Sequence, residues 1–144
     1  MKKKIFFLVV LAIIIYAVIF FTAEKSGKDT DKPAKKAEIP ASTTAERINY
    51  FSMHGWEVEE VSGKNIVIPS EFSGDYAEYA EIQDRQGLPL RDYAGKNGVL
   101  YVYEVRNYSP ENMKMYAELI TCEDKIIASL VYSEDGGSVS LPVI

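Results

Sequence analysis

The sequence has few of the residue types on which most metal sites, redox sites and catalytic triads are built. It contains one cysteine, one histidine and one tryptophan among 144 residues. A single cysteine excludes an intramolecular disulfide, and a single histidine excludes a zinc site built on several histidines. Neither a G-x-S-x-G nucleophile motif nor a complete phosphate-binding loop is present. The sequence therefore predicts no catalytic residue, no cofactor, no metal ion and no enzymatic activity.

Long hydrophobic runs are also scarce, since the chain has only one, and this excludes a multi-spanning channel. Residues 5–21 are all apolar. Seventeen residues extend about 26 Å as a helix, which is close to the hydrocarbon thickness of a bilayer. We therefore predict a cytoplasmic tail at residues 1–4 and a transmembrane anchor at residues 5–23. The alternative is a cleaved secretory signal, which the bulky Phe21 disfavours at the site where a small residue is needed.

The orientation of this anchor follows from its flanks. Lysines stand on both sides of it, so a count of positive charges is nearly balanced. Long domains cross the membrane largely regardless of their charge, whereas a short cationic tail normally stays inside. We therefore expect a single-pass protein of the cell membrane, with the N-terminus inside and the C-terminal domain outside.

The remainder of the chain divides by composition and charge. Residues 24–42 are rich in Lys, Asp, Ser, Pro and Ala, and we predict a disordered linker there. Residues 43–144 carry 8 basic and 17 acidic side chains, a net charge of −9, and we predict one extracytoplasmic domain. Such an acidic domain is repelled by nucleic-acid phosphate and by anionic lipid. We therefore expect no nucleic-acid partner, and contact with the membrane through the N-terminal helix alone.

Helix signals stand at two places in this domain. Thr43 and Glu46 have the spacing of a capping box, and Gly55 suits a helix stop, so a short first helix is predicted between them. Residues 75–86 place apolar side chains toward one side, and Gly87 follows as the expected cap. This segment is predicted as a second amphipathic helix.

Strand signals occupy most of the remaining sequence. Alternating residues around a turn cluster at 62–65 predict a hairpin, and two later runs are joined by a tight turn at Glu123-Asp124. The predicted strands cover residues 56–59, 65–68, 98–108, 115–121, 125–132 and 138–143. The order is α-β-β-α-β-β-β, with the last segment a further strand. We predict an α+β fold with two short helices packed on one face of a mostly antiparallel sheet.

A resemblance to a known family is carried by residues spread through this domain. They are Arg47, Phe51, Gly55-Trp56-Glu57-Val58, Ile68-Pro69, Phe72, Tyr76, Tyr79, Gln83, Gln86-Gly87, Leu90, Tyr93-Ala94-Gly95-Lys96, Tyr101, Tyr103 and Asn107-Tyr108. In them the chain resembles a bacterial domain-of-unknown-function family, number 4830, over about residues 44–132. The resemblance implies a bacterial cell-envelope protein with an N-terminal membrane segment and the same α+β order. It implies no activity.

Tyrosine is abundant, with ten residues in the chain, and supplies the candidate site. Amphipathic rings bind sugars and extended peptides with little loss of entropy, although strands also favour tyrosine for packing. The candidate partner-binding residues are Trp56, Tyr76, Tyr79, Tyr93, Tyr101, Tyr103 and Tyr108. We expect a membrane-anchored module that binds a protein or peptide at the cell envelope. A cell-wall glycan-binding module is the alternative, a carboxylate-dependent hydrolase is a third hypothesis, and the oligomeric state stays open.

Three other features have structural interpretations. His54 stands where the first helix should end, and we expect it to cap that helix. Cys122 lies in an apolar strand pattern, and we expect a buried thiol. Acidic pairs such as Glu59-Glu60 and Glu123-Asp124 are expected at the solvated surface. A hydrolase would need two such acids at a fixed spacing across one cleft.

Overall fold

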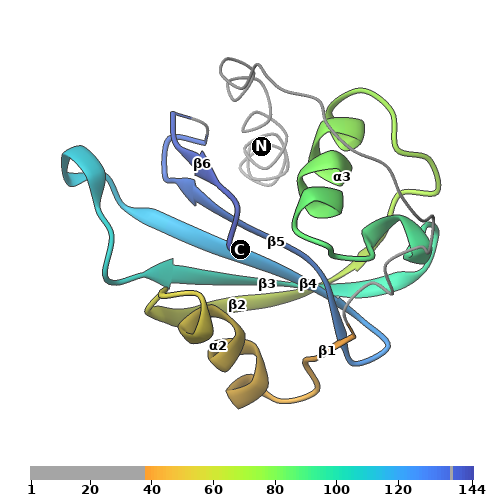
Figure 1. Cartoon of the computed structure of the whole chain (residues 1–144), viewed down its shortest axis with the longest axis horizontal. Coiled ribbons are helices and arrows are strands. Elements are labelled where there is room, and N and C mark those ends of the chain that lie inside the picture. Colours follow the sequence, from red (N-terminus) through yellow and green to blue (C-terminus); the bar gives the residue numbers. More distant parts are fainter. Residues whose placement is uncertain (1–37, 137) are drawn as a thin grey trace, which may run out of the picture.

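A six-stranded antiparallel sheet forms the centre of the part of the chain that the computed structural model describes, residues 38–136 and 138–144. Two helices and two short 3-10 turns accompany it, so the α+β class is confirmed (Figure 1). The strands are β1 (Ile39–Pro40), β2 (Val58–Val67), β3 (Asn97–Val105), β4 (Met115–Cys122), β5 (Lys125–Ser133) and β6 (Ser140–Leu141). The helices are α2 (Thr44–Met53) and α3 (Asp75–Arg85), and the turns are η1 (Leu90–Tyr93) and η2 (Pro110–Asn112).

The strands follow the order β1-β5-β4-β3-β2, and β6 also pairs with β5. The connection from β2 to β3 contains α3, whereas β4 and β5 form a hairpin through Glu123 and Asp124. Both turn residues have positive φ, 51° and 60°, as a tight hairpin turn requires. The predicted turn at this place is therefore confirmed.

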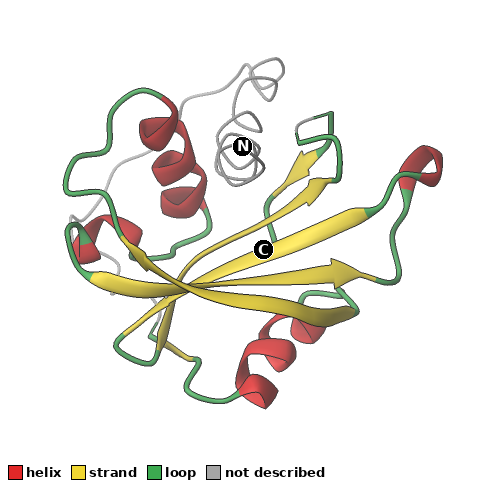
Figure 2. Cartoon of the chain, turned by 180° about the vertical axis from the view of Figure 1, so that it is seen from behind, coloured by secondary structure: helices red, strands yellow, loops and turns green. Residues whose placement is uncertain are grey.

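The two helices lie on opposite faces of the sheet, so the prediction that both pack on one face is wrong (Figure 2). Successive side chains of a strand point to opposite faces, and β4 shows this directly. Its Ala117 and Leu119 pack in a cluster beneath α2, whereas Ile120 packs in a cluster beneath α3. Almost every residue of β4 and β5 is buried, so both faces of the sheet need a cover.

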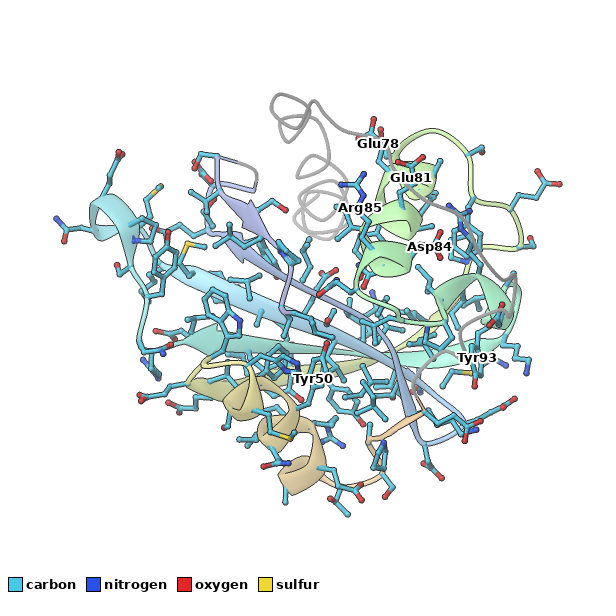
Figure 3. All side chains as sticks on the ribbon, in the orientation of Figure 1. Tyr50, Glu78, Glu81, Asp84, Arg85 and Tyr93 are labelled. Atoms are coloured by element: carbon cyan, nitrogen blue, oxygen red, sulfur yellow. The ribbon has the colours of Figure 1, made fainter. Side chains whose placement is uncertain are left out.

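These two clusters form the core and are named here after their helices. The α3 cluster consists of Ile68, Tyr79, Ala80, Leu90, Ile120, Cys122, Ile127, Ala128, Leu130 and Tyr132. The α2 cluster consists of Ala41, Tyr50, Phe51, Leu88, Tyr103, Val105, Met115, Ala117, Leu119, Ile126, Val131 and Val143. Figure 3 shows the corresponding orientation of side chains: Tyr50 lies between α2 and the sheet, and Glu78 and Glu81 lie on the exposed side of α3.

Both predicted helices are confirmed with their end signals. The Thr43 side chain accepts from the Glu46 N–H at 3.1 Å, and the Glu46 carboxylate accepts from the Thr43 N–H at 3.0 Å. This is the reciprocal capping box expected from the spacing. Gly55 and Gly87 both have positive φ, 85° and 72°, just beyond the two helices. Backbone there adopts a left-handed conformation that favours glycine.

The predicted hairpin at 56–68 is wrong, because β2 is one continuous strand through the predicted turn cluster. Gly63 pairs with Tyr101 on β3, and a Cβ built on Gly63 would lie 3.0 Å from the Tyr101 ring carbon Cε1. The glycine permits a close approach of this ring and does not form a turn. The order after β1 is therefore α-β-α-β-β-β-β, and a register shift near Val61 supplies the irregularity.

The N-terminal boundaries change in one respect. Ile39 and Pro40, predicted within the linker 24–42, form β1 and pair with Ile126 and Lys125. The predicted tail 1–4, the predicted anchor 5–23 and residues 24–37 lie outside the described residues. No helix in the part of the chain that is described is long and apolar enough to span a membrane.

The last strand, predicted at residues 138–143, is shorter in the structure, where it covers Ser140–Leu141.

Two glutamine side chains complete the outer edge of β5 between β1 and β6. They are Gln83 in α3 and Gln86 at the C-cap of this helix. The Ser129 N–H donates to Gln83 Oε1 at 2.9 Å, and Gln86 Nε2 donates to the Ser129 carbonyl at 2.9 Å. Gln86 Oε1 in turn accepts from the N–H of Val143 at 2.7 Å and of Ile144 at 3.2 Å. The amides therefore act as a strand would, and they connect α3 and the C-terminal residues to the sheet.

Replacing Gln86 with alanine should destabilise the domain, because the buried Ser129 carbonyl and the Val143 N–H would lose their partner. We expect the free energy of unfolding to fall by about 3 kcal/mol. Urea unfolding of the full chain in detergent micelles, followed by the fluorescence of the single Trp56, measures this change. The exposed Glu81→Ala on the same helix serves as control and should change the value by less than about 0.5 kcal/mol. Similar values for the two variants would contradict the role of Gln86.

Candidate functional site

The structure does not bring the seven candidate aromatic residues into one groove. Tyr79 packs in the α3 cluster and Tyr103 in the α2 cluster, and both are buried. Tyr76 and Tyr93 are partly buried, on α3 and on η1. Trp56 and Tyr108 contact each other edge to face, with ring centroids 5.9 Å apart. Tyr101 alone of the seven lines a groove on the sheet.

A groove of about 570 Å³ lies on the α2 face of the sheet, beside the segment that leads from β1 into α2. Four segments meet there: this entry segment, the end of β2, the start of β3, and the turn between β4 and β5. The lining residues are Ala41, Ser42, Asn65, Ile66, Val67, Asn97, Gly98, Val99, Tyr101, Thr121, Cys122, Glu123 and Asp124. Of the predicted site residues, Tyr101 lines this groove.

Tyr101 is fixed between a helix and the edge strand. The guanidinium carbon of Arg47 lies 3.8 Å from the centroid of its ring, which is cation–π geometry. Gly63 on β2 lies against the ring carbons Cε1 and Cδ1. The ring therefore lies over Gly63 on the edge strand β2, where a larger residue would displace it.

Arg47 holds this arrangement through a buried polar network. Its side chain donates from Nε to the Tyr103 hydroxyl at 3.2 Å and from Nη2 to Glu60 Oε2 at 3.1 Å and to Thr44 Oγ1 at 2.9 Å. The Tyr103 hydroxyl donates to the same Glu60 oxygen at 3.1 Å. Burial alone would lower the pKa of Arg47, but the bonds to Tyr103 and Glu60 raise it. The guanidinium is therefore charged and its position is set from several sides.

The turn between β4 and β5 supplies the acidic rim of the groove. Lys96 Nζ lies 2.7 Å from Glu123 Oε1, and this hydrogen bond lowers the pKa of the Glu123 carboxyl. Asp124 is exposed and forms no ion pair with any residue of the described ranges 38–136 and 138–144. The rim therefore carries negative charge that Lys96 balances in part.

An exposed apolar side chain marks the other wall. Val67, the last residue of β2, is 68% exposed and lines the groove. Val61 on the same strand is 58% exposed and lies outside the groove. No described strand pairs with the outer edge of β2. The groove is thus bounded by an open sheet edge.

A second polar cluster, which sequence reasoning missed, lies sealed beneath α3. Glu118 on β4 is 1% exposed, and neither carboxylate oxygen has a hydrogen-bond partner among the described residues. The same holds for the Tyr79 hydroxyl and for Gln83 Nε2, both from α3. Burial raises the pKa of Glu118 to about 7, against an opposing influence of the Tyr79 hydroxyl. A glutamate inside the apolar run of β4 was the signal available in the sequence.

The structure places the other sequence candidates in structural roles. His54 is the C-cap of α2 and packs on the Tyr50 ring with centroids 5.0 Å apart, as expected. Cys122 is buried in the α3 cluster, as expected, and burial raises the pKa of its thiol. A thiol–imidazole pair of these two residues is not formed, because they pack against different helices. Within residues 38–136 and 138–144 no three His, Cys, Asp or Glu side chains gather to hold a metal ion.

Comparison with known proteins gives one family. The family model described as "Domain of unknown function (DUF4830)" matches residues 50–131, which begin within α2 and end within β5. No curated protein and no solved structure matches the chain. The matched segment contains the β2 wall of the groove, Tyr101 and the acidic rim.

Replacing Arg47 with methionine should destabilise the domain, because the partly buried Glu60 carboxylate and the buried Tyr103 hydroxyl would lose a hydrogen-bond partner. We expect a loss of about 3 kcal/mol in the free energy of unfolding, measured by urea titration. Arg85→Met is the matched control, since the Arg85 side chain is 70% exposed and its ion pair with Glu81 is worth little. Equal losses in the two variants would contradict a structural role for the Arg47 network.

Replacing Glu118 with glutamine should remove a pH dependence of stability. The folded pKa of about 7 lies above the ordinary 4.5, so the folded state binds more protons between these values. The free energy of unfolding of the wild type should therefore fall as the pH rises from about 4.5 to about 7, by about 3 kcal/mol at about 1.4 kcal/mol per pKa unit. Urea titrations at pH 4.5, 6 and 8 measure the decline, which Glu118→Gln should lack.

Two tyrosines are the other titratable groups next to Glu118. Tyr79 approaches it from α3 and Tyr132 from β5. The Tyr116 ring stacks on the Tyr132 ring, with centroids 6.0 Å apart. Burial raises the pKa of Tyr79 and of Tyr132, so both stay neutral over this range. The exposed Glu81→Gln is the control and should keep the wild-type decline. A decline of the same size in Glu118→Gln would refute the assignment.

Proposed function

The chain belongs to the domain-of-unknown-function family DUF4830, and from that premise we propose that its α+β domain binds an extended polypeptide segment in the groove beside β2. The groove carries the proposal. It offers an aromatic ring at Tyr101, an exposed apolar side chain at Val67, and side-chain amides at Asn65 and Asn97. Rigid aromatic residues next to adaptable amides are typical of polypeptide-binding surfaces.

We also propose that the domain acts outside the cell membrane, tethered by the anchor predicted at residues 5–23. The support is the sequence alone, namely the apolar run and its flanks. The entry segment at Ala41 and Ser42 lines the groove, so a bound partner would lie beside the point where the chain enters the domain. A partner at the envelope, close to the outer leaflet, fits this arrangement.

Polypeptide binding is favoured over glycan binding by the placement of the tyrosines. Sugars stack on exposed aromatic faces, and of the seven candidate residues Tyr101 is the one that lines the groove, with Arg47 against its ring. Carboxylate-dependent hydrolysis is disfavoured for a different reason. A general acid needs a raised pKa, whereas Lys96 lowers the pKa of Glu123 at the rim, and Glu118 lies on the other face of the sheet.

The test uses a library of random decapeptides selected on the full chain in detergent micelles. We expect selected peptides to bind with micromolar dissociation constants, and Val67→Arg to weaken them about tenfold by placing a charge in the apolar wall. Val61→Arg is the matched control on the same strand and should leave the affinity unchanged. Fluorescence anisotropy measures the affinity. Failure to select any peptide, or equal affinities for both variants, would refute the proposal.

A further inference from the structure

Resting on the proposed function, we infer that the bound segment pairs with β2 as an added strand and carries a lysine or arginine that contacts Asp124. Two backbone hydrogen bonds at the ends of the β2–β3 pairing show which main-chain groups of β2 face β3 and which face away. The Ile68 N–H donates to the Lys96 carbonyl at 2.9 Å, and the Arg106 N–H donates to the Glu57 carbonyl at 2.8 Å. Residues of an antiparallel strand alternate between facing the partner strand and facing away.

Counting back from Ile68 along the register assigns the outward positions. The N–H and C=O groups of Ile66 and Lys64 face β3. Those of Val67, Asn65 and Gly63 therefore point away from the sheet. All three residues are exposed, and no described strand pairs with them. The outer edge of β2 therefore presents unpaired donors and acceptors in the pattern that an extended polypeptide complements.

The same positions connect the edge to the groove. The side chains of Asn65 and Val67 lie in the groove, and Tyr101 extends over Gly63. In a hydrogen-bonded pair of an added strand, the opposing side chain points to the same face of the sheet. Alternate side chains of the added segment would therefore enter the groove, next to the Tyr101 ring and Val67. Apolar residues suit these places.

The edge also limits where a strand can add. A register shift near Val61 interrupts the ladder, and Lys64 directs a charge to the other face. Bulges and lysines on an edge oppose unspecific strand pairing. Strand addition is therefore confined to the groove end of β2, about residues 62–68.

Charge specifies one further feature of the segment. Asp124 lines the groove and is exposed, and Glu123 beside it is balanced by Lys96. The whole chain has a formal net charge of −5. An oppositely charged side chain next to Asp124 is favoured by Coulomb attraction and sets the direction of the segment. A lysine or arginine in the segment is the complement.

The experiment uses the tightest decapeptide from the selection in two N-methylated forms, one methylated at even positions and one at odd positions. In an added strand one set of amides faces β2 and the other faces solvent. We expect one form to lose at least about thirtyfold in affinity and the other to change less than about threefold. Equal effects of the two forms would overturn strand addition while the proposed function stands. If no decapeptide is selected at all, the proposed function itself fails.

Variants of the full chain test the same geometry from the protein side. Asn65→Pro removes an outward N–H and should weaken the affinity for the unmethylated peptide about tenfold. Lys64→Ala should leave this affinity unchanged, because the backbone groups of Lys64 face β3.

Asp124→Asn tests the charge of the segment. Asparagine suits the positive φ of 60° at this position, and the change should weaken the affinity for a basic peptide several-fold at low salt. Glu111→Gln on η2, which does not line the groove, is its control. Unchanged affinity in Asp124→Asn would overturn the inferred basic residue.

Discussion

The domain depends on the completion of one sheet edge. From Ile126 to Ser133 every residue of β5 is buried, so an unpaired N–H or C=O on its outer side would cost about as much as a lost hydrogen bond. Three pieces of chain from different parts of the sequence satisfy that side: β1 at its start, Gln83 and Gln86 at its middle, and β6 at its end. The entry segment, α3 and the C-terminal residues are therefore all held by the same strand.

The opposite edge of the sheet, formed by β2, is exposed and has no pairing strand among the described residues. β2 is exposed along most of its length, and its glutamates and Lys64 keep it hydrated. Beneath it, the Arg47 network fixes Glu60 and Tyr103, and the Tyr101 ring lies over Gly63. Next to the groove, this exposed edge leaves main-chain groups that no described strand pairs with. The contrast between the two edges is what directs the functional proposal to β2.

Local signals in the sequence were sufficient for the helices and for the turn between β4 and β5. A capping box at Thr43 and a glycine after each helix act within a few residues, so they can be identified without tertiary structure. Long-range contacts were beyond such signals. Residues 62–65 have the composition of a turn, and only the contact with the Tyr101 ring on β3 explains the glycine at position 63. Glu118 is buried by residues far along the chain, and Gln86 bonds to Val143 at the C-terminal end. The groove exists only once four separate segments meet.

The pairing of β1 has a mechanical consequence. This strand has two residues, Ile39 and Pro40, on the outermost side of the sheet, and Ala41 follows with one bond to the Asp124 carbonyl at 2.8 Å. Tension applied through the preceding chain would therefore act on these few bonds before it acted on the long central strands. Because Ala41 and Ser42 also line the groove, breaking these bonds would change the shape of the groove.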